Sequence, residues 1–380
     1  MKENKTKISI LAVSLGGGGA EKVISLILPN LSTIYDVTLI LMYPVFHFNV
    51  PENVKIIILN ENPHQSRFKT IFEYPKFILN FLRIIKTNKI DVSISFLTRP
   101  NILNGIAKFF YGKRLRVILS ERNYPSIEYD SKGFRYIIYK ILIPIFYNKS
   151  DLIFSNSLWI NKDLKDNFDI RVPMTVIYNP IVIPDKYKLP TNQIIKPSKI
   201  VSVGRLIPTK NHEMILRAFH ILNKKQLNLS IFGAGELDNY LLKYSETLNI
   251  DKQVTFLGRV KNVTELLCEY DIFVMSSNSE GFPNALLEAM SVGIPVISTN
   301  CLSGPLEILN ENFEVFIKEG EFIECKYGLL INVNDSLGLS NAISFLINNE
   351  YEYIRYSELS RARAKDYSID DIFKEFIKII

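Results

Sequence analysis

Two successive rounds of one pattern, in which short apolar β-rich runs alternate with helix-length segments, most strongly constrain the fold of this chain. Such alternation is typical of parallel sheets flanked by helices. The rounds are separated by Asn179–Ser198, a stretch rich in Pro and Lys that breaks the rhythm. A chain of 380 residues also exceeds what one core usually supports. The sequence therefore predicts an α/β protein of two Rossmann-like, doubly wound domains that face each other across a cleft.

The expected strands can be assigned in both rounds. In the first they are Ile8–Ser14, Val37–Tyr43, Lys55–Leu59, Val92–Phe96, Val117–Ser120, Leu152–Ser155 and Thr175–Ile177. In the second they are Ile200–Val203, Leu229–Phe232, Val254–Phe256, Ile272–Met275 and Val296–Ser298, with helices expected near 211–222, 238–248 and 285–291. Ligands of such sheets bind beyond the carboxyl ends of the strands, so the loops after strands are where we expect the site.

The cysteines and the apolar runs limit the compartment. Cys268, Cys301 and Cys325 are odd in number and lack metal-ligand spacing, which fits a reducing compartment. The N-terminus has a basic start but no cleavage pattern, and its apolar run passes directly into Gly16. No apolar stretch reaches about 18 residues, so no membrane span is expected.

Charge is unevenly distributed. Residues 1–180 contain 24 Lys and Arg against 14 Asp and Glu, a net charge of +10, and the rest of the chain contains 21 against 25, a net charge of −4. A basic first half favours an anionic ligand or membrane leaflet. Nucleic acid is a weaker candidate because no recognition motif accompanies the charge.

A run of four glycines follows the first strand and precedes a helical segment. Glycines let the backbone approach a ligand closely, and a helix start favours negative charge. The run Gly16–Gly19 is not G-x-G-x-x-G, and Val37–Tyr43 leads into Pro44 without the acid that a dinucleotide site would need. A phosphate-binding loop and a tight turn without ligand both remain open.

A cationic loop follows the first strand of the second round. In VSVGRLIPTKNHEMILRAF, Gly204 provides the turn, and Arg205 and Lys210 precede a helix. Forked and point-charge donors at a helix start suit a diphosphate and would neutralise the charge on a nucleoside diphosphate leaving group. A solvated surface loop is the alternative.

Two glutamates lie eight residues apart after a later strand. Glu280 falls in a polar turn, and Glu288 falls in the helix that Pro283 introduces. Carboxylates so placed can accept hydrogen bonds from hydroxyl groups at two ends of one ligand, with the N–H groups of Gly281, Phe282 and Asn284 between them. Alternatively, Glu280 complements the helix dipole and Glu288 lies on a solvated face.

Together these motifs resemble the retaining glycosyltransferases of family 4, which have the two-domain GT-B fold. The resemblance covers nearly the whole chain and also rests on Ala20-Glu21, on FGAGEL (Phe232–Leu237) and on FLGRV (Phe256–Val260). It implies an N-terminal acceptor-binding domain (1–180), a C-terminal nucleotide-sugar-binding domain (181–365) and a last helix (366–380) that crosses back to the first domain.

The resemblance also implies roles for individual residues. Glu280, Arg205 and Lys210 would form the catalytic set, with Arg205 and Lys210 clamping the donor diphosphate and Glu280 contacting the donor sugar. Glu288 would bind the ribose. The implied donor-binding residues are Gly17, Gly18, Gly19, Gly204, Gly233, Val260, Gly281, Phe282, Asn284, Ala285 and Glu288. Transfer would retain the anomeric configuration, and neither a metal nor another cofactor is expected.

One departure from the family concerns the loop after Val117–Ser120, where many members carry a histidine. Here the sequence is SERNYP, and with SFLTRPN before it the chain looks like a bacterial branch that extends lipid-diphosphate-linked oligosaccharides. That branch makes surface polysaccharides such as lipopolysaccharide, O-antigen or capsule on undecaprenyl diphosphate, often from UDP-sugars. Arg99, Glu121, Arg122 and Asn123 are then expected on the acceptor and donor-sugar side. The alternative is a structural, buried Arg–Glu ion pair.

Two segments of the basic half mix aromatic, aliphatic and basic residues, Ser66–Lys89 and Gly133–Lys149. Either could lie in a bilayer interface or pack in the core. Core packing is favoured for the second segment, which leads directly into a strand. With the +10 charge, this predicts peripheral attachment to the cytoplasmic face of the cell membrane.

Three other kinds of protein could use the same scaffold: an epimerase, a phosphorylase and a non-catalytic subunit. A UDP-sugar epimerase would need acid and base groups for C2 chemistry, and a phosphorylase would need a pyridoxal lysine; neither signature stands out. A non-catalytic partner subunit would be expected to have lost the clamp or the glutamates, and both are intact.

Overall fold

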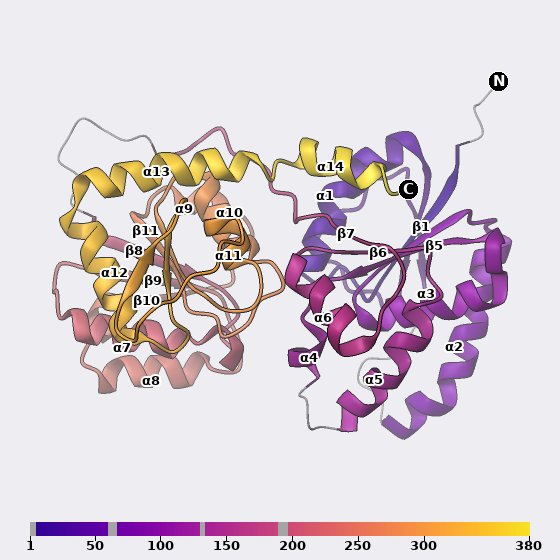
Figure 1. The fold of residues 1–380 in the computed structure, drawn as a ribbon, viewed down its shortest axis with the longest axis horizontal. Coiled ribbons are helices and arrows are strands. Elements are labelled where there is room, and N and C mark those ends of the chain that lie inside the picture. Colours follow the sequence, from indigo (N-terminus) through magenta and orange to yellow (C-terminus); the bar gives the residue numbers. More distant parts are fainter. Residues whose placement is uncertain (1–4, 60–66, 130–133, 189–196) are drawn as a thin grey trace. The chain divides into compact units, whose positions relative to one another are not determined.

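The computed structural model describes residues 5–59, 67–129, 134–188 and 197–380 and divides into two compact units (Figure 1). Unit 1 comprises Met1–Pro180 and Ile369–Ile380, and unit 2 comprises Ile181–Ser368. The chain therefore leaves unit 1 once, after Pro180, and returns to it for its last residues. The predicted linker straddles this boundary; its residues 189–196 lie outside the described part.

Unit 1 is built on a seven-stranded parallel sheet with the order β3-β2-β1-β4-β5-β6-β7. The strands are β1 (Lys7–Ala12), β2 (Asp36–Leu41), β3 (Lys55–Ile58), β4 (Val92–Phe96), β5 (Arg116–Glu121), β6 (Leu152–Ser155) and β7 (Met174–Val176). The helices are α1 (Gly19–Ile34), α2 (Arg67–Thr87), α3 (Thr98–Tyr111), η1 (Gly112–Arg114), α4 (Pro125–Glu128), α5 (Phe134–Tyr147), α6 (Leu158–Phe168) and α14 (Ile369–Ile377). Strand order reverses between β1 and β4, so their loops flank the switch point at which such sheets bind ligands.

Alternate side chains of the unit-1 strands feed two cores, one on each face of the sheet. Ile8 and Ile10 of β1 join the cluster formed with α1, whereas Leu11 joins the cluster formed with α2, α3, α5 and α6. The last helix, α14, contributes Ile372, Phe373 and Phe376 to the α1 side. The C-terminal residues thus complete the core of the first unit.

Unit 2 contains a second seven-stranded sheet, ordered β10-β9-β8-β11-β12-β14-β13 and parallel except for β13. The strands are β8 (Lys199–Val203), β9 (Asn228–Phe232), β10 (Val254–Gly258), β11 (Ile272–Met275), β12 (Val296–Thr299), β13 (Phe322–Glu324) and β14 (Leu329–Ile331). The helices are η2 (Pro208–Lys210), α7 (His212–Leu222), α8 (Asp238–Thr247), η3 (Asp251–Gln253), α9 (Val263–Leu267), α10 (Asn284–Ser291), α11 (Pro305–Asn310), α12 (Ser336–Asn348) and α13 (Glu350–Lys365). The switch point lies between β8 and β11.

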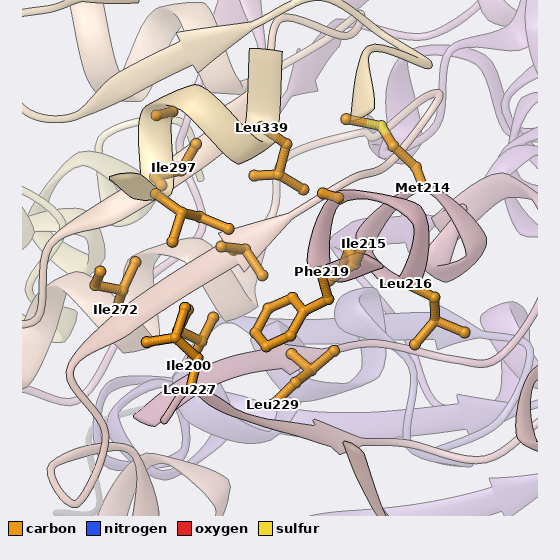
Figure 2. Close-up of a cluster of buried hydrophobic side chains, with 14 of the residues drawn as sticks. Ile200, Met214, Ile215, Leu216, Phe219, Leu227, Leu229, Ile272, Ile297 and Leu339 are labelled. Carbon is orange, nitrogen blue, oxygen red and sulfur yellow. The ribbon is translucent and has the colours of Figure 1, made fainter. Parts of the chain in front are cut away.

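The unit-2 core lies where helices α7 and α12 cover the sheet. Figure 2 shows Phe219 and Ile215 of α7 with the strand residues Ile200 and Leu229, and Leu339 of α12 packs against the same cluster. All five side chains have at most 2% of their surface exposed. This packing fixes the start of α7, and with it the loop between β8 and α7.

The predicted α/β class with two doubly wound domains is confirmed, and every strand expected from the sequence overlaps an observed one. The sequence did not indicate β13 and β14, which are three residues long each. In the described part of the chain, no helix combines the length and the apolar character that crossing a bilayer requires.

Candidate active site

Glycines allow three loops of unit 2 to meet at the carboxyl edge of the sheet. The N–H of Gly204, after β8, donates to the carbonyl of Phe232 (2.9 Å), and the N–H of Gly233 donates to the carbonyl of Gly258 (2.8 Å). Gly233 has φ +146°, and a Cβ there would lie 1.8 Å from the Gly204 carbonyl oxygen. Only glycine fits at this position. Val260, half-buried, follows in the third loop.

The cationic loop is anchored on its other side to the loop after β11. The N–H of Asn278 donates to the carbonyl of Thr209 (2.8 Å), and the hydroxyl of Ser276 donates to the carbonyl of Lys210 (2.8 Å). Arg205 is exposed, and among the described residues its guanidinium has no protein partner. Its donors are therefore available to an anionic ligand.

Lys210 and Glu280 form an ion pair that joins two predicted site residues. The Lys210 Nζ lies 2.5 Å from Glu280 Oε1, and the side chains are 23% and 10% exposed. The same oxygen accepts a hydrogen bond from Ser277 (2.6 Å). Glu280 thus acts as a partner of the cationic loop, 70 residues away in sequence, and not as a simple helix-start acid.

The loop after β12 holds the Glu280 turn through its backbone. The N–H of Glu280 donates to the carbonyl of Leu302 (2.8 Å), and the N–H of Ser303 donates to the carbonyl of Glu280 (2.9 Å). The Ser303 hydroxyl donates to the carbonyl of Gly281 (2.7 Å). Sequence reasoning missed this loop. Its signal was available, because Leu302–Gly304 follows a predicted strand and contains Ser and Gly.

Helix α10 begins at Asn284, directly after the loop that carries Glu280, and its second residue, Ala285, is half-buried. Phe282 is buried at 5% exposure, and Glu288, one turn into the helix, is buried at 6%. The alternative that Glu288 lies on a solvated helix face is therefore wrong. A buried carboxylate is costly unless it is paired with a cation or accepts hydrogen bonds.

His212 is the first residue of α7 and lies directly beside the cationic loop. It is 3% exposed, and its Nδ1 has no hydrogen-bond partner among the described residues. Burial and, to a smaller extent, the charge of Lys210 together lower the pKa of His212 to about 4. The imidazole is therefore neutral at physiological pH and adds no charge to the cationic loop.

In unit 1, the glycine loop leads from β1 into α1, and Gly17, Gly18 and Gly19 are exposed. Gly17 has φ +96°, with the ring of His47 next to it, and a Cβ on Gly18 would lie 2.3 Å from the Glu21 carboxylate. The loop therefore presents bare backbone at a helix start, as a phosphate site would require. The exposed glycines are equally compatible with a ligand-free turn.

The turn from β4 into α3 contains a strained residue, Leu97, two positions before Arg99. Leu97 has φ +76°, which is rare for a non-glycine residue, and its N–H donates to the carbonyl of Ser120 on β5 (3.0 Å). Such strain is concentrated at functional sites. Arg99 is half-buried in the first turn of α3.

Glu121, at the end of β5, is fully buried and holds the loop that follows it. Its Oε2 accepts hydrogen bonds from Tyr147 (2.6 Å) and Thr98 (3.1 Å), and its Oε1 accepts from the N–H groups of Arg122 (3.0 Å) and Asn123 (3.4 Å). Burial raises the pKa of Glu121 above its ordinary value, and these hydrogen bonds oppose the shift only in part. The carboxylate therefore fixes the backbone of the two residues that follow it.

Arg122 is 4% exposed. Its guanidinium donates to Asn179 Oδ1 (2.6 Å), which also accepts from Asn156 (3.3 Å), and it lies 5.6 Å from the ring centroid of Phe96. Burial lowers the pKa of Arg122 to about 9, and the charge of Glu121 opposes this. Among the described residues, no side-chain hydrogen bond or ion pair joins the Arg122 guanidinium to Glu121, so the buried ion pair considered as an alternative is not formed; the guanidinium is held by Asn179 instead.

The structure gathers the predicted residues at two sheet edges. The unit-2 edge holds Gly204, Arg205, Lys210, Gly233, Val260, Glu280, Gly281, Phe282, Asn284, Ala285 and Glu288, and the unit-1 edge holds Gly17, Gly18, Gly19, Arg99, Glu121, Arg122 and Asn123. Sequence reasoning missed Ser303 in unit 2 and Tyr147, Asn156 and Asn179 in unit 1. Across the described ranges, no group of three or more His, Cys, Asp or Glu side chains could hold a metal ion.

Comparison with known proteins identifies the family to which this chain belongs. The family "Glycosyltransferase Family 4" matches residues 17–183, and "Glycosyl transferases group 1" matches residues 187–366. An uncharacterized glycosyltransferase of Methanocaldococcus jannaschii is 30% identical over 363 residues, covering 86% of this chain and 87% of that protein. These matches define the class of protein: a glycosyltransferase of the GT-B fold, with two Rossmann-like domains. The chain belongs to glycosyltransferase family 4.

Two further matches extend over almost the whole chain. The N-acetylgalactosamine-N,N'-diacetylbacillosaminyl-diphospho-undecaprenol 4-alpha-N-acetylgalactosaminyltransferase of Campylobacter jejuni is 29% identical over 376 residues, covering 98% of this chain and 99% of that protein. The crystal structure of Anabaena HepE in complex with UDP matches with a TM-score of 0.77 at 18% identity, covering 98% of this chain and 99% of that one. The likeness to HepE, at 18% identity, shows that the two proteins share a fold.

Proposed function

We propose that this glycosyltransferase moves a hexose or N-acetylhexosamine from a UDP-sugar to a lipid-diphosphate-linked saccharide, with retention of configuration and without a divalent metal. Such a reaction would serve bacterial surface glycan synthesis. The Campylobacter jejuni relative, whose name specifies a diphospho-undecaprenol-linked acceptor, supports the acceptor class. The UDP complex of Anabaena HepE supports the nucleotide.

The observation that carries the proposal is the Lys210–Glu280 pair beside the exposed Arg205. When the bond between the anomeric carbon and the diphosphate oxygen breaks, negative charge develops on the leaving diphosphate. Arg205 and Lys210 are placed to neutralise that charge, which is the role a metal ion would otherwise fill. Glu280 would contact the donor sugar, and Glu288 would accept hydrogen bonds from the ribose.

Retention requires attack on the face of the sugar from which the diphosphate departs. The acceptor hydroxyl oxygen then forms a bond to the anomeric carbon as the carbon–phosphate oxygen bond breaks. Its proton passes to an oxygen of the leaving diphosphate. This route needs no protein base at the anomeric carbon, which suits a chain that lacks the family histidine after β5.

For the acceptor, we propose the loops after β4 and β5 in unit 1. Arg99 and Asn123 are half-buried there, Arg122 is buried beneath with its Nε–H unpartnered among the described residues, and Glu121 positions Arg122 and Asn123 through their N–H groups. Arg122→Ala should lower turnover on a lipid-diphosphate acceptor. Unchanged turnover would contradict the assignment. The enzyme would work at the cytoplasmic face of the cell membrane, attached peripherally.

The test is a transfer assay with a panel of UDP- and GDP-sugars, a lipid-diphosphate sugar acceptor and excess EDTA. We expect acceptor-dependent UDP release that survives EDTA, is lost in Glu280→Ala and Lys210→Ala, and persists in Lys225→Ala, which removes an exposed lysine on another loop. NMR of the product decides the anomeric configuration. UDP binding without release from any donor would favour a non-catalytic partner subunit, and no nucleotide binding would overturn the proposal.

A further inference from the structure

Phe282 lies in the turn between Glu280 and α10 and is wedged between two neighbours in unit 2. The centroid of its ring lies 5.6 Å from that of Tyr367, and the two rings are tilted against each other. On another side, a Cβ added to Gly304 would lie 3.2 Å from the Phe282 Cα. Phe282 and Tyr367 are 5% and 2% exposed. Because buried groups are closely packed, a shift of the Tyr367 ring displaces this turn, Glu280–Asn284, which is called the donor loop below.

Tyr367 also holds the point at which the chain enters unit 2. Ile181 is the first residue of unit 2, and Ser368 is the last. The N–H of Ile181 donates to the carbonyl of Tyr367 (2.9 Å), and Ile181 pairs with Ser368 in a parallel bridge. The residue whose ring contacts Phe282 is therefore also the residue whose backbone anchors the incoming chain.

The chain is also anchored directly before it leaves unit 1. The Arg122 guanidinium donates to Asn179 Oδ1 (2.6 Å), and Asn156 donates to the same oxygen (3.3 Å). Asn179, Pro180 and Ile181 are all buried, and these three residues are called the crossing below. Boundaries between domains usually fall in exposed linkers that make few contacts. A buried crossing that is anchored on both sides is instead suited to pass a displacement from one end to the other.

We propose that Asn179 and Tyr367 are positioning residues that couple the donor loop to the acceptor loop, Glu121–Asn123, through the crossing. The contacts of this path, in order from the donor loop, are Phe282 with Tyr367, Tyr367 with Ile181, the chain from Ile181 to Asn179, and Asn179 with Arg122. Each contact lies within one unit, and only the covalent chain passes from one unit to the other. The identity of the two loops rests on the proposed function, but their coupling can be measured without an acceptor.

Such coupling has a direct use in a transfer reaction. A ligand that orders one end of a packed path reduces the free energy needed to order the other end. The effect is reciprocal, so nucleotide would order the acceptor loop and acceptor would tighten nucleotide binding by the same factor. The donor sugar would then be activated chiefly when an acceptor is in place, which limits its loss to water.

The experiment is amide hydrogen exchange of the full chain with and without saturating UDP. In wild type, UDP should slow exchange at the acceptor loop as well as at the donor loop. In Tyr367→Leu, UDP should protect only the donor loop, whereas Tyr367→Phe keeps the ring and should behave like wild type. The matched control, Tyr353→Leu, truncates a tyrosine of the same 2% exposure in the unit-2 core and should keep both effects.

Asn179→Ala interrupts the same path from unit 1 and leaves the donor loop unaltered. This variant should bind UDP with wild-type affinity, yet UDP should give its acceptor loop no protection. A short-chain lipid-diphosphate sugar should raise the affinity of wild type for UDP about fivefold and leave that of Asn179→Ala unchanged. Isothermal titration measures both affinities.

Circular dichroism melts and UDP titration establish that each variant is folded and binds nucleotide. Protection of the acceptor loop by UDP in either folded variant, Tyr367→Leu or Asn179→Ala, would overturn the inference, because UDP would then act on that loop by another route. An acceptor loop that UDP leaves unchanged in wild type would also overturn it. Coupled loops in a protein that transfers no sugar would refute the proposed function and leave the positioning role standing, and transfer without coupling would do the reverse.

Discussion

The Nζ of Lys210 lies 2.5 Å from the Oε1 of Glu280, so the residue proposed to bind the donor diphosphate and the residue proposed to contact the donor sugar neutralise each other. A diphosphate that reaches Lys210 must compete with this carboxylate. Diphosphate binding would then release Glu280 towards the sugar. The pair would thus link nucleotide binding to the release of the carboxylate that is proposed to contact the donor sugar.

Competition for Lys210 predicts opposite effects of Glu280→Gln on binding and on transfer. Without the carboxylate, UDP meets an unpaired Lys210 and less repulsion, so its affinity should rise about fivefold, equivalent to roughly 1 kcal/mol. Transfer should nevertheless be lost. Isothermal titration with UDP measures the first effect, and Lys210→Ala should weaken UDP instead. Weaker UDP binding by Glu280→Gln would mean that the carboxylate orients Lys210 and does not compete for it.

The close approach of Gly233 to Gly204 predicts that the cationic loop depends on a residue with no side chain. In Gly233→Ala the added Cβ would clash with the Gly204 carbonyl, and a φ of +146° is unfavourable for an L-residue. We therefore expect the free energy of unfolding to fall by more than about 3 kcal/mol, or the loop to be displaced with loss of UDP binding. Gly258→Ala is the control, because its φ is +67° but nothing lies within 4 Å of the added Cβ. It should cost about 1 kcal/mol and leave UDP binding intact. Urea unfolding and UDP titration compare the two, and equal losses would contradict the steric argument.

The positions of these glycines explain how much the sequence could predict. Alternation of strands and helices indicated all seven strands of the first sheet and five of the seven in the second, and the rule that ligands bind after strands placed Arg205, Lys210 and Glu280 in loops. The glycine at 233 could be associated with the site only through the family resemblance, because its contact with Gly204 crosses 29 residues. Backbone contacts between loops leave no periodicity in the sequence.

The same limit applies in unit 1. Glu121 follows a predicted strand and was expected to line the site, but its side chain turns inward to Tyr147 and Thr98. Tyr147 was expected only as a core residue of a helix. Side-chain direction at a strand end depends on which buried donors surround it, and those donors come from distant segments.

This network predicts that Tyr147 is a positioning residue for the acceptor loop. Tyr147→Phe removes one hydrogen-bond donor from the buried Glu121 carboxylate and should lower the free energy of unfolding by about 1–3 kcal/mol. Because Glu121 holds the N–H groups of Arg122 and Asn123, the acceptor KM should rise while UDP affinity stays unchanged. Tyr111→Phe loses a comparable hydrogen bond, to the Leu82 carbonyl (2.8 Å), remote from the loop. It should reduce stability without changing the acceptor KM; equal effects of both variants on KM would refute the positioning role.

The buried His212 predicts a specific loss of stability in acid. Its pKa is about 4 in the folded protein and about 6.5 when unfolded, so between these values the unfolded chain binds a proton that the folded chain does not. The free energy of unfolding should therefore fall by up to about 1.4 kcal/mol per pH unit as pH drops from 6.5 towards 4, and this contribution is fully present above pH 6.5. His212→Gln removes the titrating group and should flatten the decline, whereas His220→Gln, at an exposed histidine on the same helix, should not. Urea unfolding at pH 7.5 and 5.0 measures the slopes. Parallel slopes for wild type and His212→Gln would show that other groups, not this imidazole, govern acid stability beside the clamp.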